Sequence, residues 1–153
     1  ASGQVGRGAV HEFTVSVVVG RTGRTLAVVP KEIVSKRGIT YVAITRRHQA
    51  IDAYCRGLQR VFSADGPFNV QLRVDARTAS PRAFEINPRF STTVSLTCAA
   101  GVDEPAELIA QALGRPPAAD LPWRDGVVLL RHMTDAFLDE TAFVGRAEAL
   151  ARA

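Results

Sequence analysis

Apolar and β-branched residues dominate two early segments of the chain, and their pattern predicts a β-hairpin. Residues 11–19 and 25–29 are rich in Val, Thr and Phe, with a turn over residues 20–24. The next segment, residues 30–38, is polar and carries both lysines, so we expect a loop there. A third strand is predicted over Ile39–Thr45, where apolar residues alternate with smaller or polar ones.

At His48 the spacing of apolar residues changes from that of a strand to that of a helix. The apolar stripe of this predicted helix consists of Ile51, Tyr54, Cys55, Leu58, Val61 and Phe62. We expect the helix to end near residues 65–67, because Asp-Gly-Pro is a strong stop signal. Two further strands are predicted over residues 68–74 and 83–87, joined by the polar residues 75–82.

The last third of the chain predicts short helices and a final hairpin. Residues 91–100 fit a short helix, and Asp103 fits the N-cap of a second helix. We expect four apolar residues of this second helix to face the core: Leu108, Ile109, Ala112 and Leu113. Residues 126–131 and 136–138 fit a terminal hairpin, and residues 140–151 are compatible with a closing helix.

Strands and helices are therefore mixed without a regular strand–helix–strand alternation. This order favours an α+β domain with a mostly antiparallel sheet and packed helices. The chain has 153 residues, of which 46% are hydrophobic. That length suits one core, so we expect a single domain. We expect residues 1–10 to lie outside it, as a disordered or added segment.

Charge and composition narrow the classes of function. The net charge of +4 comes almost entirely from arginine, since Lys31 and Lys36 are the only lysines. The arginines are scattered and do not interleave with aromatic residues, so we expect no nucleic-acid partner. No apolar run reaches the roughly 20 residues of a membrane span, and we expect a soluble, cytoplasmic protein. Cys55 and Cys98 are too few for a disulfide framework or a zinc site, and we expect buried free thiols.

The hairpin predicted around position 78 is the main candidate for chemistry. A turn centred near position 78 or 79 places Gln71 opposite Glu85 or Asn87. Glu85 and Asn87 share a face because side chains alternate along a strand. One carboxylate and two amide carbonyls suit a hard divalent cation such as magnesium, and the guanidinium of Arg89 suits a phosphate or acyl phosphate. By spacing alone, a solvated sheet face is the alternative.

Two motifs in this hairpin resemble the ATP-grasp superfamily. Residues 84–89, Phe-Glu-Ile-Asn-Pro-Arg, are similar to its Glu-Ile-Asn-Pro-Arg signature, and residues 66–71, Gly-Pro-Phe-Asn-Val-Gln, are similar to the preceding Gly-x-x-Asn-x-Gln strand. Residues 11–15 resemble the strand that opens the C-terminal subdomain, and residues 99–102 resemble the helix end after the signature. The resemblance covers residues 12–138, and residues 130–131 match carbamoyl phosphate synthase-like members.

The resemblance implies a role for each motif residue. Gln71, Glu85 and Asn87 would be magnesium ligands that bridge the phosphates of ATP, with manganese as a second suitable ion. Arg89 would be catalytic, contacting the transferring phosphoryl group or its acyl product.

Four further residues would bind the nucleotide or substrate by the same resemblance. Glu12 would bind the ribose hydroxyls, and Phe84 would form the floor of the adenine pocket, with a core aromatic as the alternative. Lys31 and Arg37 would approach the substrate or phosphate from the polar loop, with a solvated loop as the alternative.

The implied activity is that of an ATP-dependent ligase, in which a carboxylate becomes an acyl phosphate and is captured by an amine, ammonia or a thiol. The implied partners are small-molecule carboxylate and amine substrates. Carbamoyl phosphate synthases carry a second arginine where Thr92 stands here, so the substrate is left open.

The family's glycine-rich loop and phosphate-binding lysine have no counterpart in these residues. We therefore expect the C-terminal portion of an ATP-grasp domain, without turnover on its own. The alternative is a non-catalytic folding or dimerisation module with an incomplete nucleotide site, and an exposed cleft would favour a homodimer.

Overall fold

Six strands form one antiparallel sheet in the order β5-β4-β1-β2-β3-β6. The computed structural model describes residues 10–75, 77–116, 120–135, 137 and 139. In chain order the strands are β1 Val10–Val19, β2 Thr25–Arg37, β3 Ile39–Thr45, β4 Phe68–Asp75, β5 Pro81–Asn87 and β6 Val128–Leu130. The prediction of an α+β fold with a mostly antiparallel sheet is confirmed.

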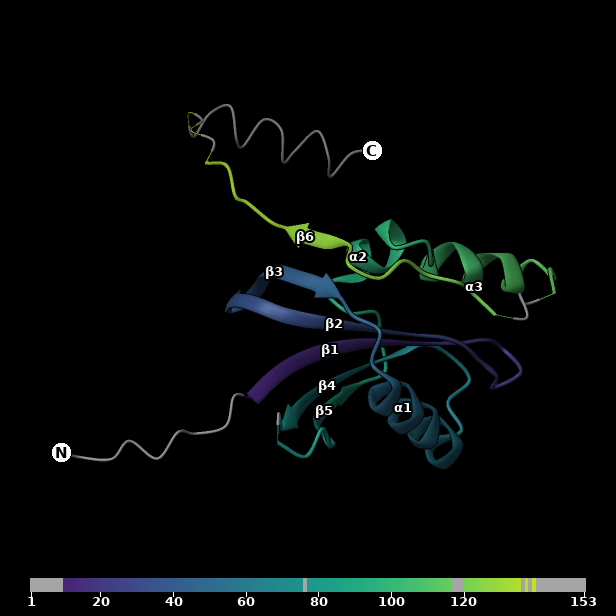
Figure 1. Cartoon of the computed structure of the whole chain (residues 1–153). Helices are drawn as coiled ribbons and strands as arrows, with labels where there is room; N and C mark the ends of the chain where they lie inside the picture. Colours follow the sequence, from purple (N-terminus) through teal and green to yellow (C-terminus); the bar gives the residue numbers. More distant parts are fainter. Residues whose placement is uncertain (1–9, 76, 117–119, 136, 138, 140–153) are drawn as a thin grey trace.

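Helices cover both faces of this sheet (Figure 1). Helix α1, Gln49–Phe62, lies on one face, and α2, Val94–Ala99, and α3, Glu104–Ala112, lie on the other. Among the described residues, none of the helices is both long and apolar enough to cross a lipid bilayer.

Strand β1 contributes to two apolar layers because its side chains alternate between the faces. Val15 and Val17 pack with Ile51 and Cys55 of α1 in the larger layer. Val18 packs into a smaller layer on the other face, together with residues of β2 and Val102. Residues 15–19, Val-Ser-Val-Val-Val, are nearly all apolar, which is the composition expected of a strand that is buried on both faces.

The prediction of a helix beginning at His48 is confirmed, but α1 ends at Phe62, before the predicted stop at residues 65–67. The ring Nδ1 of His48 accepts a hydrogen bond from the backbone N–H of Ile51 at 3.4 Å, so His48 is the N-cap. Ser63 ends the helix in a left-handed conformation with φ 49°. Asp52 in the first turn and Arg60 in the last complement the helix dipole.

The loop predicted over residues 30–38 is wrong, because most of it belongs to β2. Residues from Lys31 to Arg37 pair with β3, and Gly38 makes the tight turn between the two strands with φ 73°. Polar composition suggested a loop, but hydrogen bonding to strands on both sides at Lys31 outweighs the low strand preference of its polar neighbours.

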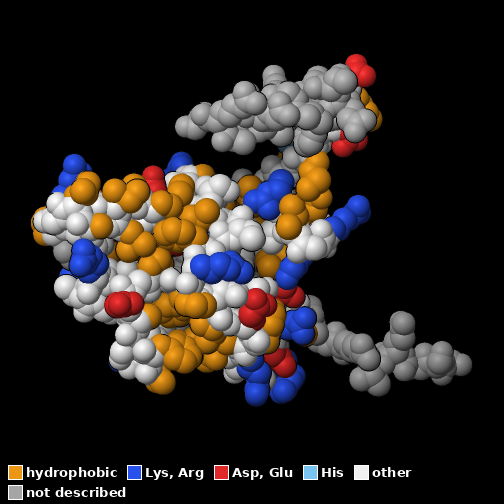
Figure 2. Space-filling model, turned by 180° about the vertical axis from the view of Figure 1, so that it is seen from behind, with side chains coloured by type: hydrophobic (Ala, Val, Ile, Leu, Met, Phe, Trp, Pro, Cys, Tyr) orange, Lys and Arg blue, Asp and Glu red, His pale blue; other side chains and the backbone are white. Residues whose placement is uncertain are grey.

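The inward face predicted for α3 is also wrong. Ile109 and Leu113 are 61% and 75% exposed, whereas Glu104 and Gln111 are buried. Gln111 is held by the β1–β2 turn, where its Oε1 accepts from the N–H of Arg21 at 2.9 Å. Seen from behind, many apolar side chains lie on the outer surface of the molecule (Figure 2).

Three other predictions concern the last strand, the two ends of the chain and the two cysteines. Strand β6 pairs with β3, so residues 126–131 do not need a partner at 136–138. Residues 136, 138 and 140–151 of the predicted hairpin and closing helix, and residues 1–9, lie outside the described residues. Cys55 is a buried thiol as predicted, and burial raises its pKa to about 12, but Cys98 is only partly buried.

Candidate functional site

The β4–β5 hairpin has the register that the sequence predicts. Gln71 pairs with Glu85, and two residues further Asn69 pairs with Asn87. These side chains lie on the sheet face opposite α1, because the intervening Val70 and Leu72 belong to the α1 layer.

A β-bulge at Phe84 turns Glu85 toward this face. The pairs Gln71–Glu85 and Leu72–Ala83 are adjacent on β4, which leaves Phe84 as the extra residue on β5. Ala83 packs against the α1 layer, and strict alternation would send Glu85 to the same side. The inserted residue reverses that direction. Phe84 itself is 51% exposed and stacks against the guanidinium of Arg73 at 5.0 Å, so it is not a core aromatic.

The three predicted metal ligands converge on one point. The amide Nε2 of Gln71 donates to Oε2 of Glu85, and Nδ2 of Asn87 donates to Oε1 of the same carboxylate, each at 2.8 Å. Both amides therefore present nitrogen to the carboxylate. A half-turn of each amide would present oxygen to a cation at the same place.

Charged side chains extend this cluster across β1 and β2. The ammonium of Lys36 lies 3.4 Å from Oε1 of Glu12 and 3.4 Å from Oε1 of Gln71. Glu12 also approaches the guanidinium of Arg73 at 3.5 Å. We call Glu12, Lys36, Gln71, Glu85 and Asn87 the polar strip.

A cavity of about 160 Å³ adjoins the polar strip. Lys36 and Gln71 line it on the sheet side, and Arg89 and Thr92 line it from the segment after β5. The Arg89 side chain is exposed, and its Nη1 donates to the carbonyl of Phe90 at 2.8 Å. The cavity thus places a lysine and an arginine next to the three candidate metal ligands. Two positive side chains at this place suit an anionic ligand.

Buried hydroxyl and amide groups fix the floor of this cavity. Asn69 Nδ2 donates to Thr14 Oγ1 at 2.8 Å, and Thr14 bonds to the hydroxyl of Ser91 at 3.3 Å. Ser91 in turn bonds to Thr93 at 2.8 Å, next to the N-terminus of α2. This network ties the segment that carries Arg89 to the sheet.

Lys31 does not reach the site. It lies on β2 with no exposed surface, and its ammonium donates to Ser16 at 2.7 Å and Thr97 at 2.8 Å. Burial lowers the pKa of Lys31 to about 8, against the opposing attraction of Glu104. Arg37 is exposed at the end of β2, where it pairs with Ile39, and its side chain makes no hydrogen bond or ion pair with another described residue.

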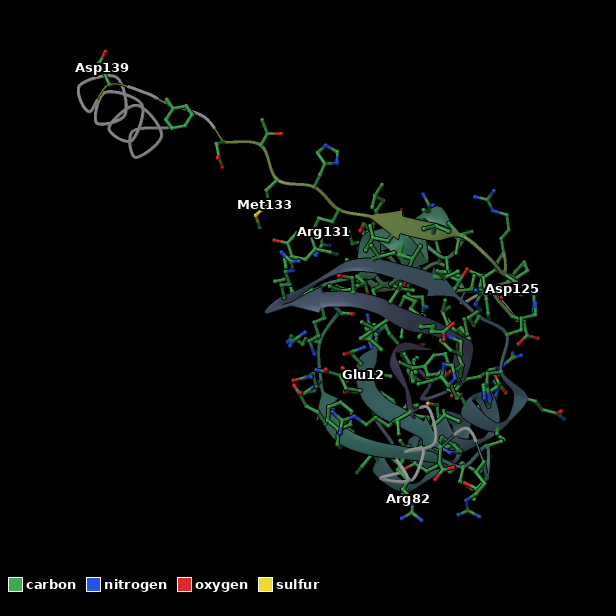
Figure 3. All side chains as sticks on the ribbon, turned by 60° about the vertical axis from the view of Figure 1, so that its left-hand side comes forward. Glu12, Arg82, Asp125, Arg131, Met133 and Asp139 are labelled. Atoms are coloured by element: carbon green, nitrogen blue, oxygen red, sulfur yellow. The ribbon has the colours of Figure 1, made fainter. Side chains whose placement is uncertain are left out.

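Two residues near the cavity were not selected from the sequence. Lys36 lies on the same segment as Lys31 and Arg37, and a segment expected to be a loop has no predicted side-chain direction that would favour Lys36 over them. Arg131 donates to the carbonyls of Thr40 and Thr92, each at 3.0 Å, and both threonines line the cavity. Figure 3 shows Arg131 and Glu12 at the same end of the sheet. The match at residues 130–131 pointed to Arg131, but not to its contact with Thr92.

The donor set fits magnesium better than a metal that needs several protein ligands. Among the described residues, no group of three or more His, Cys, Asp or Glu side chains is arranged so that it could hold a metal ion. The cluster offers one carboxylate and two amides, and magnesium is commonly held by one or two carboxylates with water and substrate phosphates. The residues therefore fit an ion that arrives with a polyphosphate.

Comparisons with known proteins identify the family and the fold. The family model described as ATP-grasp in the biosynthetic pathway with Ter operon matches residues 9–136. No curated protein matches the chain.

Among solved structures, N5-carboxyaminoimidazole synthase from Aspergillus clavatus, in complex with ADP and 5-aminoimidazole ribonucleotide, has a TM-score of 0.61 at 22% identity, over 92% of this chain and 39% of that one. N5-carboxyaminoimidazole synthetase from Staphylococcus aureus has a TM-score of 0.56 at 17% identity, over 74% and 32%. Pyruvate carboxylase T882A from Rhizobium etli has a TM-score of 0.57 at 18% identity, over 74% and 13%. These likenesses show a shared fold, and the chain spans less than half of each of these three structures.

Proposed function

The chain belongs to the family of ATP-grasp proteins in the biosynthetic pathway with the Ter operon, and from this premise we propose that it holds the magnesium-bound phosphates of ATP in a carboxylate ligase. The observation that carries the proposal is the convergence of Gln71 and Asn87 on the Glu85 carboxylate, each at 2.8 Å. Bound magnesium would supply charge neutralisation for the polyphosphate.

The polar strip would position the nucleotide around that ion. Glu85 would be the charged ligand, and the amides of Gln71 and Asn87 would turn their oxygens toward the cation. Phe84, already half exposed and stacked on Arg73, offers an apolar surface for the adenine ring. Glu12 would accept hydrogen bonds from the ribose hydroxyls after exchanging its contacts with Lys36 and Arg73.

The basic side of the cavity would receive the phosphoryl acceptor. Arg89 and Lys36 line it on opposite walls, so both can neutralise charge on a carboxylate or on the acyl phosphate made from it. An amine, ammonia or thiol would then displace the phosphate. We infer that Arg131 shapes this wall through the Thr92 carbonyl, where carbamoyl phosphate synthases have a second arginine.

The nucleotide site can be tested on this chain by titration calorimetry. We expect magnesium-dependent binding of ATP that becomes at least about tenfold weaker in Glu85→Gln, because a charged ligand contact contributes roughly 1.5–3 kcal/mol. Glu32→Gln is the matched control, since Glu32 lies on the opposite face with His11 and Arg46. ATP binding should be unchanged in this control.

The rival proposal is a non-catalytic folding or dimerisation module with an incomplete nucleotide site. Absence of magnesium-dependent heat at millimolar ATP would favour it. The matched structures are much longer than this chain, so ligase turnover is proposed for the whole protein. Release of ADP should depend on residues that supply the other wall of the nucleotide site.

A further inference from the structure

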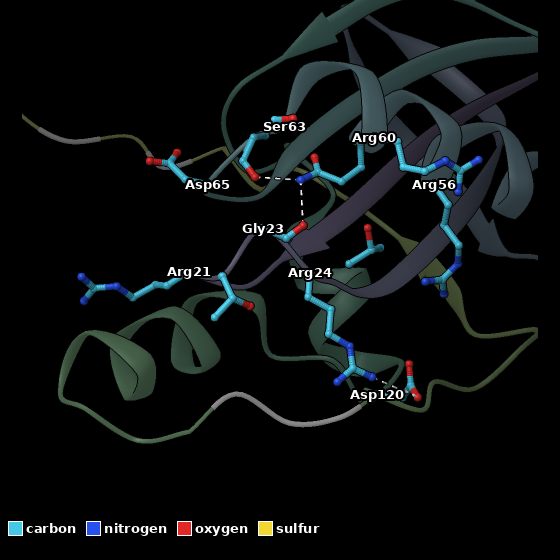
Figure 4. Close-up of a pocket in the computed structure, with 12 residues that line it drawn as sticks. Arg21, Gly23, Arg24, Arg56, Arg60, Ser63, Asp65 and Asp120 are labelled. Atoms are coloured by element: carbon cyan, nitrogen blue, oxygen red, sulfur yellow. Dashed lines mark hydrogen bonds and ion pairs between the residues drawn. The ribbon is translucent and has the colours of Figure 1, made fainter.

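A second cavity, of about 670 Å³, lies at the far end of β1 (Figure 4). One wall is the β1–β2 turn, residues 21–25, and the other is the C-terminal part of α1 with residues 63–65. Thr14 lines the first cavity and Gly20 precedes this turn, so about 20 Å of strand separates the two cavities. The second cavity is not part of the proposed nucleotide site.

Arginine dominates the charge of this cavity. Arg21 and Arg24 come from the turn and Arg56 and Arg60 from α1, against the carboxylates of Asp65 and Asp120. Four positive and two negative side chains leave a net charge of +2 on the lining.

The existing ion pairs of these arginines leave much of their charge available. Arg24 approaches Asp120 at 3.8 Å with both side chains more than half exposed, which makes the contact weak. Arg56 bonds to Asp52 at 2.9 Å along the helix. Neither Arg21 nor Arg60 has a side-chain ion pair with another described residue.

Hydrogen bonds hold the two walls in place. The buried Gln59 donates from Nε2 to the carbonyl of Gly23 at 3.0 Å and to that of Ala64 at 2.7 Å, so it links the turn to the end of α1. Gln111 of α3 accepts from the N–H of Arg21 at 2.9 Å. A ligand would meet a cavity whose backbone is already ordered, which lowers the cost of binding.

We propose that this arginine pocket binds a small polyanion that carries at least two phosphate or carboxylate groups. Planar guanidinium groups suit both kinds of anion, and arginines on two facing walls suit a ligand whose charges are separated. The site needs no metal ion and is independent of the proposed nucleotide cluster.

The test uses the 153-residue chain in the presence of EDTA, which removes divalent ions. Inorganic pyrophosphate and tricarballylate are titrated separately by calorimetry, so the two arms distinguish phosphate from carboxylate ligands. Binding of either supports the proposal. The double variant Arg21→Gln, Arg60→Gln should weaken binding by at least roughly tenfold, since each lost charged hydrogen bond contributes severalfold or more.

Three controls keep the result specific. Arg82→Gln removes an exposed arginine from the start of β5, and Glu85→Gln alters the nucleotide cluster; both should leave anion binding unchanged. Arg60→Lys keeps the charge without the fork and should weaken binding less than Arg60→Gln. Urea unfolding confirms that the variants are folded.

If neither pyrophosphate nor tricarballylate gives a heat of binding, the proposal is wrong. It is also overturned if Arg82→Gln reduces binding as much as the double variant, because the attraction is then general. Stronger anion binding in Glu85→Gln would place the anion at the nucleotide cluster instead, because the variant removes a negative charge there. Magnesium-dependent ATP binding should survive the double variant, so failure of this site and failure of the proposed function are separable.

Discussion

Replacing Lys31 with methionine should stabilise the protein near neutral pH, although it removes two hydrogen bonds. The Lys31 ammonium is fully buried, and its attraction to Glu104 only partly offsets the loss of hydration. Ser16 and Thr97 also bond to each other at 3.2 Å, so neither hydroxyl loses its last partner. Methionine fills much of the same volume without a buried charge.

The magnitude follows from the pKa of Lys31, which falls from 10.5 to about 8 on folding. Between these values the unfolded chain binds more protons than the folded chain, so the free energy of unfolding rises with pH. The cost of burying the charge is present in full below about pH 8 and disappears as pH approaches the unfolded pKa. The full effect is about 3 kcal/mol, of which about 2.5 kcal/mol lies between about pH 7 and pH 10.

Urea unfolding of wild type and Lys31→Met across this pH range measures the effect. Cys55 acts in the opposite direction: burial raises its pKa to about 12, so its contribution to stability is lost as pH rises above its unfolded value of 9.0. Both proteins share that loss, so the difference between their free energies of unfolding gives the contribution of Lys31 alone. Lys36→Met, at an exposed lysine, is the matched control.

We expect Lys31→Met to be more stable than wild type near pH 7 and to lose that advantage toward pH 10. A difference that does not change with pH would refute the reasoning, since it would mean that Lys31 does not change protonation between the folded and unfolded states.

Four further predictions concern the core, the site and the hairpin. Leu72→Ala should lower the free energy of unfolding by about 2–5 kcal/mol, measured in urea, because Leu72 is fully buried; a smaller loss would mean that the α1 layer closes over the gap. Phe84→Ala should weaken ATP binding severalfold but leave stability nearly unchanged, and equal affinity would exclude stacking on this ring. If the whole protein is the proposed ligase, Arg131→Gln should weaken its affinity for the carboxylate substrate more than its affinity for ATP, as steady-state kinetics can show. The N–H groups of Arg77 and Thr78 lower the pKa of Asp75, so the folded protein loses this part of its stability when acid protonates Asp75. Asp75→Asn should remove this acid-dependent loss, and urea unfolding at low pH that shows the same loss in the variant would contradict the reasoning.

Local patterns were sufficient to predict most elements and the hairpin register. The polar connection between the two strands limited the partner of Gln71 to Glu85 or Asn87, and the structure has the first of these two pairings. The cap at Asp103 depends on neighbouring residues alone and is found, whereas α1 ends at Ser63, before the Asp-Gly-Pro sequence that was expected to stop it.

Prediction from the sequence failed where contacts between distant segments determine the local structure. Residues 31–37 look like a loop until β3 is present to pair with them. The apolar residues of α3 suggested its buried face, yet Gln111 faces inward because the β1–β2 turn offers it a hydrogen bond. Lys31 was chosen as a ligand on the same loop assumption, and neither Ser16 nor Thr97 is near it in sequence.

The bulge at Phe84 makes the direction of the Glu85 and Asn87 side chains depend on how many residues β5 contains, and not only on which residues they are. With Ala83 anchored beneath α1, deleting Phe84 would swing Glu85 into the apolar layer and Asn87 after it. A change of strand length by one residue should thus be more harmful than any single replacement in the motif.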